Sequence, residues 1–298
     1  MIETLRNRFA LPGVHFHQHG RLVVMELTNS QGSASITTMG ATVLGYTPQG
    51  GDELIWVSET AHFDGTRPVR GGIPICWPWF GAHPNDSAQK AHGFARHLPW
   101  EIESVTVEDD VTRAILRLQA DEATRRIWPH DFVLTLTVTL GETLHLDLTA
   151  ENRDDETWQL SEALHSYFRV TDAHDIAIEG LEGLNYWDKQ QGGIRGIQSS
   201  PLRARPPIDR VFFDHQGKAV IEDHARRIVV EKAGSATTVV WNPGPEGVRA
   251  FDDMSDDAWR EMLCVETANA IDNGYALRPG ERHTLSATIR TEQTLARR

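Results

Sequence analysis

Two titratable side chains occur within apolar, strand-like segments of the sequence. His165 lies in the segment 162–168, and Glu266 follows Cys264 and Val265. Carboxylates are almost never fully buried without a partner, so a glutamate in such surroundings is either paired or functional. Burial raises the pKa of a glutamate toward the range of a general base, and histidine titrates near neutral pH. The two residues could therefore perform acid–base chemistry, although a structural His–Glu or Glu–Arg pair would give the same pattern.

The segment from Arg70 to Gly81 combines an arginine with flat aromatic side chains. The planar fork of Arg70 suits an anionic group, and the glycines after it could let the backbone approach a ligand closely. Trp77, Trp79 and Phe80 offer faces that suit the C–H faces of a sugar ring. An aromatic core segment beside a surface arginine would give the same composition, and this alternative stays open at this stage.

A second basic segment, His92-Gly-Phe-Ala-Arg96-His97, follows the polar loop 85–90. It supplies another arginine and two histidines beside a glycine, which could serve binding or catalysis. The start of a strand with a structural histidine explains the same residues equally well, because a histidine on its own is more often structural than catalytic.

Other polar clusters favour plainer explanations. His15, His17 and His19 would share one face of a strand, as metal ligands might, but the triplet contains no carboxylate to complete a site. A solvated strand or loop explains them as well. The acidic run from Asp252 to Asp257 indicates the solvated start of a helix over Ser255–Leu263, with Ser255 as its N-cap.

The elements that must position these residues are mainly strands, because apolar and polar residues alternate with a period of two. The pattern over Phe132–Leu140 and from Leu144 to Leu148 predicts a hairpin with Gly141-Glu142 as a two-residue turn. Many short strands separated by turn signals predict an all-β sandwich or barrel. With no repeat and no linker, residues 1–298 are expected to form a single domain. Further strands are predicted at Arg21–Asn29, Ser33–Thr38, Glu53–Ser58, Arg113–Ala120, Asp175–Glu179, Arg227–Lys232, Thr237–Asn242 and His283–Arg290.

Composition narrows the possible partners. The formal net charge of −13 argues against nucleic-acid binding, and it requires any phosphate site to be a local basic pocket. Two cysteines, Cys76 and Cys264, do not make a disulfide framework and fit a reducing compartment. The N-terminal residues lack the apolar core of a signal peptide, and no segment is apolar enough to span a membrane. We therefore expect a cytoplasmic monomer without a membrane or nucleic-acid partner.

Taken in order along the chain, these motifs resemble those of one enzyme family. The similarity is to the hexose-6-phosphate mutarotases, or glucose-6-phosphate 1-epimerases, of the aldose 1-epimerase superfamily, and it runs from about residue 10 to about residue 291. The segments that carry it are Arg70-Gly-Gly-Ile-Pro-Ile-Cys-Trp-Pro-Trp-Phe-Gly81, His92-Gly-Phe-Ala-Arg96, Leu164-His-Ser-Tyr-Phe168, Trp241-Asn-Pro-Gly244 and Cys264-Val-Glu-Thr267.

The resemblance implies a galactose-mutarotase-like β-supersandwich of mainly antiparallel strands with one or two short helices. It implies a general acid at His165 and a general base at Glu266. Arg70 and Arg96 would match the substrate-binding arginines of the phosphorylated-sugar branch. Asp209 would match a substrate-binding aspartate, and His92 would be an auxiliary donor near the sugar ring.

The chemistry that this family performs is the exchange of α and β anomers, here of a phosphorylated hexose. A base takes the proton of the C1 hydroxyl, an acid protonates the ring oxygen, and the open aldehyde re-closes on its other face. No electrons are exchanged and no strong nucleophile is made, so neither a cofactor nor a metal is expected.

The sequence departs from the family pattern on both sides of the second basic segment. Ala91 stands where relatives often carry glutamine or serine, and His97 where they usually carry asparagine. These departures put one substrate hydrogen bond in doubt. The alternatives are an aldose 1-epimerase for unphosphorylated sugars and a non-catalytic carbohydrate-binding protein.

Overall fold

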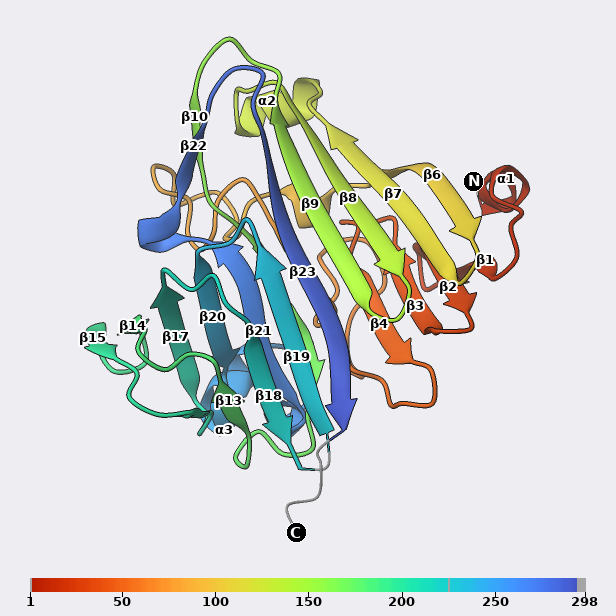
Figure 1. The fold of residues 1–298 in the computed structure, drawn as a ribbon. Coiled ribbons are helices and arrows are strands. Elements are labelled where there is room, and N and C mark those ends of the chain that lie inside the picture. The colour runs from red at the N-terminus through yellow and green to blue at the C-terminus, as the bar shows by residue number, and fades with distance from the viewer. Residues whose placement is uncertain (1, 225, 294–298) are drawn as a thin grey trace.

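Antiparallel strands dominate the computed structural model, which describes residues 2–224 and 226–293 (Figure 1). The longest sheet has nine strands in the order β16-β13-β18-β19-β23-β9-β8-β7-β6. Its bounds are β6 Glu101–Glu108, β7 Val111–Gln119, β8 Phe132–Leu140, β9 Leu144–Asn152, β13 Ala177–Glu179, β16 Leu202–Arg203, β18 Ala219–Asp223, β19 Arg226–Ala233 and β23 Arg282–Gln293.

A second sheet has eight strands and contains Asp209, on β17, and Glu266, on β21. Its order is β15-β14-β17-β20-β21-β11-β5, and β12 also pairs with β21. Its bounds are β5 Ile75–Cys76, β11 Glu162–Leu164, β12 Tyr167–Arg169, β14 Asn185–Asp188, β15 Ile194–Ile197, β17 Ile208–Phe213, β20 Thr237–Asn242 and β21 Met262–Asn269.

Smaller elements complete the fold. A four-stranded sheet contains β1 Val14–His19, β2 Leu22–Asn29, β3 Gly32–Thr37 and β4 Val43–Pro48, and β10 Trp158–Leu160 pairs with β22 Tyr275–Leu277. The helices are short: α1 Ile2–Arg8, α2 Glu122–Ile127, α3 Gly244–Gly247, and the 3₁₀ turns η1 Ala95–His97, η2 Val248–Ala250, η3 Ala258–Arg260 and η4 Ile271–Asn273. Within the described residues, no helix has both the length and the apolar character needed to cross a bilayer.

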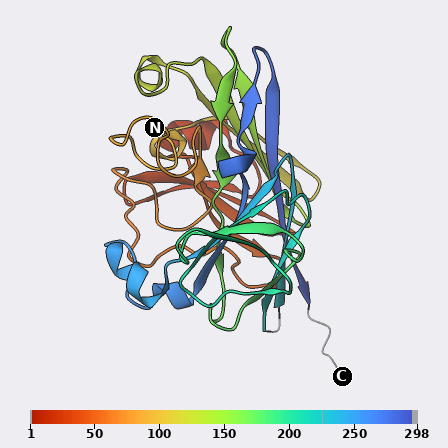
Figure 2. The ribbon, with the colours of Figure 1, turned by 90° about the vertical axis from the view of Figure 1, so that its left-hand side faces the viewer.

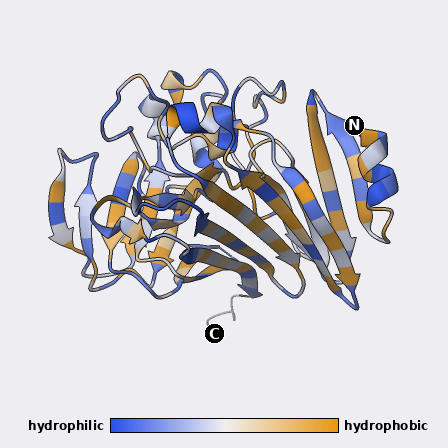
Figure 3. Cartoon of the chain, turned by 90° about the horizontal axis from the view of Figure 1, so that it is seen from above, coloured by the Kyte–Doolittle hydropathy of each residue, from blue (hydrophilic) through white to orange (hydrophobic). Residues whose placement is uncertain are grey.

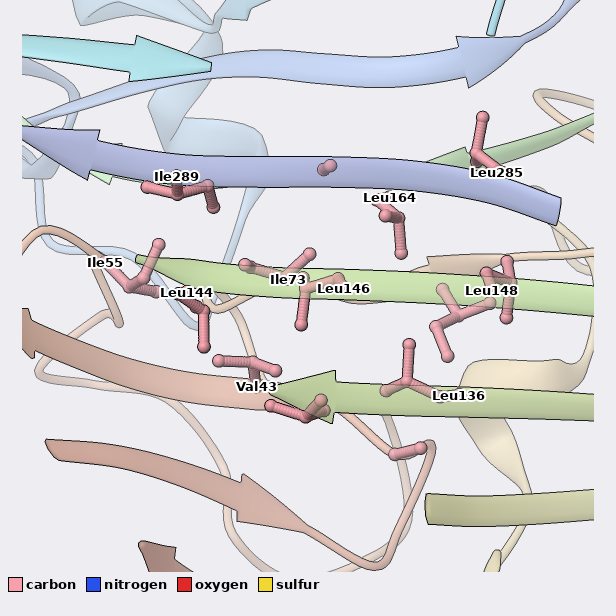
Figure 4. Packing of buried hydrophobic residues seen from close by; sticks show 14 of the residues in the cluster. Val43, Ile55, Ile73, Leu136, Leu144, Leu146, Leu148, Leu164, Leu285 and Ile289 are labelled. Carbon is pink, nitrogen blue, oxygen red and sulfur yellow. The ribbon is translucent and has the colours of Figure 1, made fainter. Parts of the chain in front are cut away.

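The main hydrophobic core fills the space between the inner face of the nine-stranded sheet and the elements that face it. Figure 4 shows leucines of β8, β9 and β23 packed against Val43, Ile55, Ile73 and Leu164. Alternation of buried and half-buried residues along β8 and β9 puts every second side chain into this core. The same alternation appears as hydrophobic and hydrophilic bands along the strands in Figure 3.

The predicted all-β fold class and most predicted strands are confirmed, but three local predictions are wrong. The turn of the β8–β9 hairpin consists of residues 141–143, because Leu140 pairs with Leu144. Residues 53–58 form only two isolated bridges. There the carboxylate of Glu53 accepts the backbone N–H groups of Tyr46 and Ile55, which removes donors that a continuous strand would use.

The helix predicted over Ser255–Leu263 is also wrong. Only the 3₁₀ turn η3 forms there; its N-cap is Asp257, whose side chain makes no capping hydrogen bond. From Met262 onward the chain is a central strand with every residue buried, paired on both sides. Tertiary burial therefore overrides the local helix signals.

The alternation along β8 yields a test of the core. Replacing Leu136, which is 1% exposed, with alanine should lower the free energy of unfolding by about 2–5 kcal/mol. The control Thr137→Ala lies on the opposite face and should change it by less than about 1 kcal/mol. Urea unfolding of both variants measures the difference, and equal losses would contradict the assigned inner face.

Candidate active site

His165 lies at a break between two short strands of the eight-stranded sheet. It follows β11 and precedes β12, and both strands pair with β21. Its backbone N–H donates to the carbonyl of Pro74 at 3.0 Å, which anchors the break. The register on either side pairs Leu164 with Thr267 and Tyr167 with Cys264, so the break lies beside Glu266.

The side chains of His165 and Glu266 meet across the two strands. Nε2 of His165 is 3.4 Å from Oε1 of Glu266, and the side chains are 10% and 1% exposed. Two distant segments of the sequence thus supply one buried pair. Nδ1 of His165 and Oε2 of Glu266 are buried and have no hydrogen-bond partner among the described residues.

Burial shifts both titrations toward the uncharged forms. Desolvation, followed by the nearby His92 and Arg96, lowers the pKa of His165 well below 6.5. Desolvation, followed by the charge of Asp209, raises the pKa of Glu266 well above 4.5. Both directions favour a pair that holds one proton and no net charge near neutral pH.

The pair lies in the wall of a cavity of about 350 Å³ that also contains every other residue predicted for the site. Arg70, His92, Arg96 and Asp209 line it together with His165 and Glu266. The fold therefore brings the six predicted residues, which come from five separate segments of the sequence, to one cavity. The remaining lining residues are Phe80, Gly81, Tyr167, Lys189, Val239, Trp241 and Phe251.

His92 is a neutral donor held in a fixed tautomer. Its backbone has a positive φ of 66°, and its Nδ1 accepts the backbone N–H of Gly81 at 3.3 Å. An Nδ1 that accepts leaves the proton on Nε2. Burial, followed by the charge of Arg96, lowers the pKa of His92 to about 3. Its ring centroid lies 5.7 Å from that of His165.

The two arginines are held in different ways. The Nε of Arg70 donates to Oδ1 of Asp253 at 3.0 Å, and its Cζ lies 4.5 Å from the centroid of the Phe251 ring. Arg96 lies in η1 and donates from Nη2 to the carbonyl of Ala91 at 3.0 Å. Its Nε has no partner within the described part of the chain. Both arginines keep N–H groups available in the cavity.

Asp209 and Lys189 form the remaining charged pair of the cavity. Lys189 Nζ is 3.2 Å from Oδ1 of Asp209, which lies on β17. Burial raises the pKa of Asp209, and the neighbouring lysine opposes this shift. Arg70, Arg96 and Lys189 therefore face two carboxylates, of which Glu266 is shifted toward its neutral form. The cavity is locally basic although the whole chain carries −13.

The aromatic and glycine predictions need correction. Of the three aromatic residues predicted to face a sugar, only Phe80 lines the cavity; Trp77 packs in the core against Trp128 and Phe132. Gly71 and Gly72 do not line the cavity. With φ of 106° and 75°, they lie so close to the backbone of Trp56 and Val43 that a Cβ atom would meet the carbonyl oxygen of each at 2.5 Å.

Sequence reasoning missed several residues of the site. Tyr167 and Trp241 lie within the quoted motifs, but nothing in the sequence assigns them a role, and Lys189 lies outside those motifs. Asp253 belongs to the run interpreted as a solvated helix start, yet it is buried, and Phe251 immediately precedes that run. An arginine that must stay charged in a cavity needs a carboxylate, but nothing in the spacing of the sequence identifies which one.

The histidine triplet does not line the cavity. His15, His17 and His19 alternate along β1. His17 is 3.6 Å from Glu26, and His19 stacks on Phe63. Among residues 2–224 and 226–293, no three His, Cys, Asp or Glu side chains gather in a way that could hold a metal ion. Cys76 and Cys264 are buried free thiols.

Comparison with known proteins matches nearly the whole chain. The sequence profile described as aldose 1-epimerase matches residues 23–290. A protein of Salmonella typhimurium, provisionally named glucose-6-phosphate 1-epimerase, is 35% identical over 252 residues, which cover 84% of this chain and 83% of that protein. A protein of Escherichia coli K12 with the same provisional name is 34% identical over 272 residues, covering 90% of each chain.

A solved structure agrees with these relatives. The crystal structure of a provisionally assigned mutarotase from Salmonella typhimurium superposes with a TM-score of 0.88 at 32% identity. It covers 97% of this chain and 99% of that chain. The predicted mutarotase-like arrangement of antiparallel strands is thereby confirmed.

Proposed function

The chain belongs to the aldose 1-epimerase family, and from this premise we propose that it interconverts the α and β anomers of a hexose 6-phosphate. Glucose 6-phosphate is the proposed substrate, because two relatives at 34% and 35% identity carry the name of that activity. The observation that carries the proposal is the contact of His165 with Glu266 in a cavity that also contains Arg70 and Arg96.

The pair can move a proton without changing its own proton count. One member takes the proton of the C1 hydroxyl while the other gives a proton to the ring oxygen, and the two exchange roles on re-closure. We assign the acid to His165 and the base to Glu266 in the ring-opening direction. This direction uses the form of the pair in which its one proton lies on His165, and ring opening leaves the pair's one proton on Glu266, the form that burial favours. Because the pair holds one proton at the start and one at the end, it is ready for the next turnover without help from solvent.

The other lining residues fit the remaining needs of the substrate. Arg70 and Arg96 offer charge-assisted donors to the phosphate, and Asp209 offers an acceptor to sugar hydroxyls. The neutral Nε2–H of His92 offers a donor near the ring. Trp241 and Phe80 offer flat faces for its C–H groups, whereas the ring of Tyr167 stacks on His165 and Trp56. The local excess of positive charge answers the objection that a chain of −13 would repel a phosphorylated sugar.

The structure gives a non-catalytic carbohydrate-binding function less support than the enzyme. A binder does not need a buried acid–base pair in the wall of its cavity. The monomeric state, the organisation as a single domain and the cytoplasmic location stay predictions from the sequence.

The acid–base assignment predicts a large loss of turnover. His165→Asn and Glu266→Gln should each lower kcat about 100-fold or more, because a positioned acid or base contributes roughly 10²–10⁴-fold. NMR magnetisation transfer between the anomeric signals of glucose 6-phosphate measures the rate, after subtraction of spontaneous exchange.

Glu162→Gln is the matched control for that experiment. Like Glu266, Glu162 is a buried glutamate, but it lies on β11 and does not line the cavity. Burial raises its pKa to about 8, so glutamine resembles the protonated form that dominates at neutral pH. This variant should keep nearly full activity. Turnover close to that of the wild type in His165→Asn and Glu266→Gln would end the assignment.

The phosphate assignment predicts a selective loss of affinity. Arg70→Ala or Arg96→Ala should raise KM for glucose 6-phosphate by roughly 10- to 100-fold, since a charge-assisted hydrogen bond contributes about 1.5–3 kcal/mol. The rate with free glucose should change much less. Arg67→Ala is the control, because Arg67 pairs with Asp252 and does not line the cavity. Equal effects on both sugars would instead favour an epimerase for unphosphorylated sugars.

A further inference from the structure

The guanidinium of Arg70 is fixed by two neighbours that come from the same loop. Oδ1 of Asp253 accepts from Nε at 3.0 Å, and the ring of Phe251 lies 4.5 Å from Cζ. These contacts hold one edge and one face of the planar group. The opposite edge is left with only a long contact, 3.5 Å from Nη1 to the hydroxyl of Tyr167. Arg70 and Phe251 both line the cavity, whereas Asp253 does not.

The burial of Asp253 shows that this contact is built into the fold. Its side chain is 4% exposed, and Arg70 is its one ion-pair partner among the described residues. A carboxylate is almost never buried to this extent without a charged or hydrogen-bonded partner. The loop between η2 and η3 thus places the buried carboxylate of Asp253 beside Nε of Arg70, while Arg70 itself lines the cavity.

A second ion pair joins the same two parts of the chain. Arg67 donates from Nη1 and Nη2 to the two carboxylate oxygens of Asp252 at 2.7 and 3.1 Å, with 35% and 74% of the side chains exposed. Figure 2 shows the orange loops around β5 and the light-blue turns after β20 protruding on the same side of the molecule. The exposed Arg67–Asp252 pair can link the two loops at the surface, while the buried Arg70–Asp253 pair extends to the cavity, which Arg70 lines.

We propose that Asp253 is a positioning residue: it holds the guanidinium of Arg70 so that its free N–H groups face the phosphate of the substrate before the substrate arrives. This inference rests on the proposed function. It assigns phosphate selectivity to a residue that does not touch the ligand. A long side chain that is already held in its bound orientation loses less conformational entropy when the ligand binds, so the affinity is higher.

Asp253 also has an effect that lowers the affinity for phosphate, because its negative charge weakens the attraction of Arg70 for an anion. The two effects can be separated by two substitutions. Asp253→Asn removes the charge and keeps an oxygen acceptor for Nε, whereas Asp253→Ala removes both. If positioning is the larger effect, asparagine rescues affinity and alanine does not.

The test compares Asp253→Ala, Asp253→Asn and the control Asp252→Ala with the wild type, using kcat and KM for glucose 6-phosphate and for glucose. Asp253→Ala should raise KM for glucose 6-phosphate about tenfold with kcat within roughly twofold, as expected for the loss of one ordered side chain. Values for glucose should be unchanged. Asp253→Asn and Asp252→Ala should stay within about threefold of the wild type.

Calorimetric titration with inorganic phosphate makes the test independent of turnover. If the wild type does not exchange anomers, the proposed function fails, but weaker phosphate binding by Asp253→Ala than by Asp253→Asn still supports the positioning role. The inference is overturned if Asp253→Ala binds as the wild type does, or if the asparagine and alanine variants are equally impaired. It is also overturned if KM changes equally for both sugars, or if the wild type binds no phosphate.

Discussion

The contact between the buried side chains of His165 and Glu266 is the interaction on which the rest of the site depends. Water is largely excluded from both groups, so each is shifted toward its uncharged form: the pKa of the histidine is lowered and that of the glutamic acid is raised. Both shifts favour the form of the pair that carries one proton and no net charge. A reaction that takes one proton and returns another needs such a pair, and it needs the pair away from solvent.

The architecture supplies this contact through an interrupted strand rather than a continuous one. β11 and β12 pair with the same strand, β21, and the gap between them lets His165 turn toward Glu266. The strand β21 is buried along its whole length, so it fixes the carboxylate rigidly. The loops at this side of the sheet then add the arginines. Glu266 thus comes from a central strand and His165 from the break beside it, whereas Arg70 comes from a loop and Arg96 from the 3₁₀ turn η1. The two arginines concentrate positive charge locally in an acidic chain.

The sequence predicted the strands wherever alternation was strong, as in β8 and β9. Through motif order it also selected six residues that the fold brings to one cavity. It failed where long-range contacts decide the structure. The helix start at Ser255 is locally favourable, but sheet pairing from Met262 onward overrides it. The buried role of Asp253 and the core position of Trp77 depend on which distant segments fold against them. Such pairings have no signature in local spacing, composition or periodicity.

The pH dependence of kcat tests the singly protonated pair most directly. It is measured as anomer exchange by NMR at saturating glucose 6-phosphate, with spontaneous exchange subtracted. Because the pKa of His165 lies well below 6.5 and that of Glu266 well above 4.5, kcat should be level as the pH passes through 6.5. It should fall on the acid side only when the pair gains a second proton, and on the alkaline side when it loses its only one. A kcat that halves at pH 6.5 and keeps falling as the pH rises would show that the pair loses its only proton at the ordinary pKa of a histidine, and it would contradict a pair that burial keeps singly protonated near neutral pH.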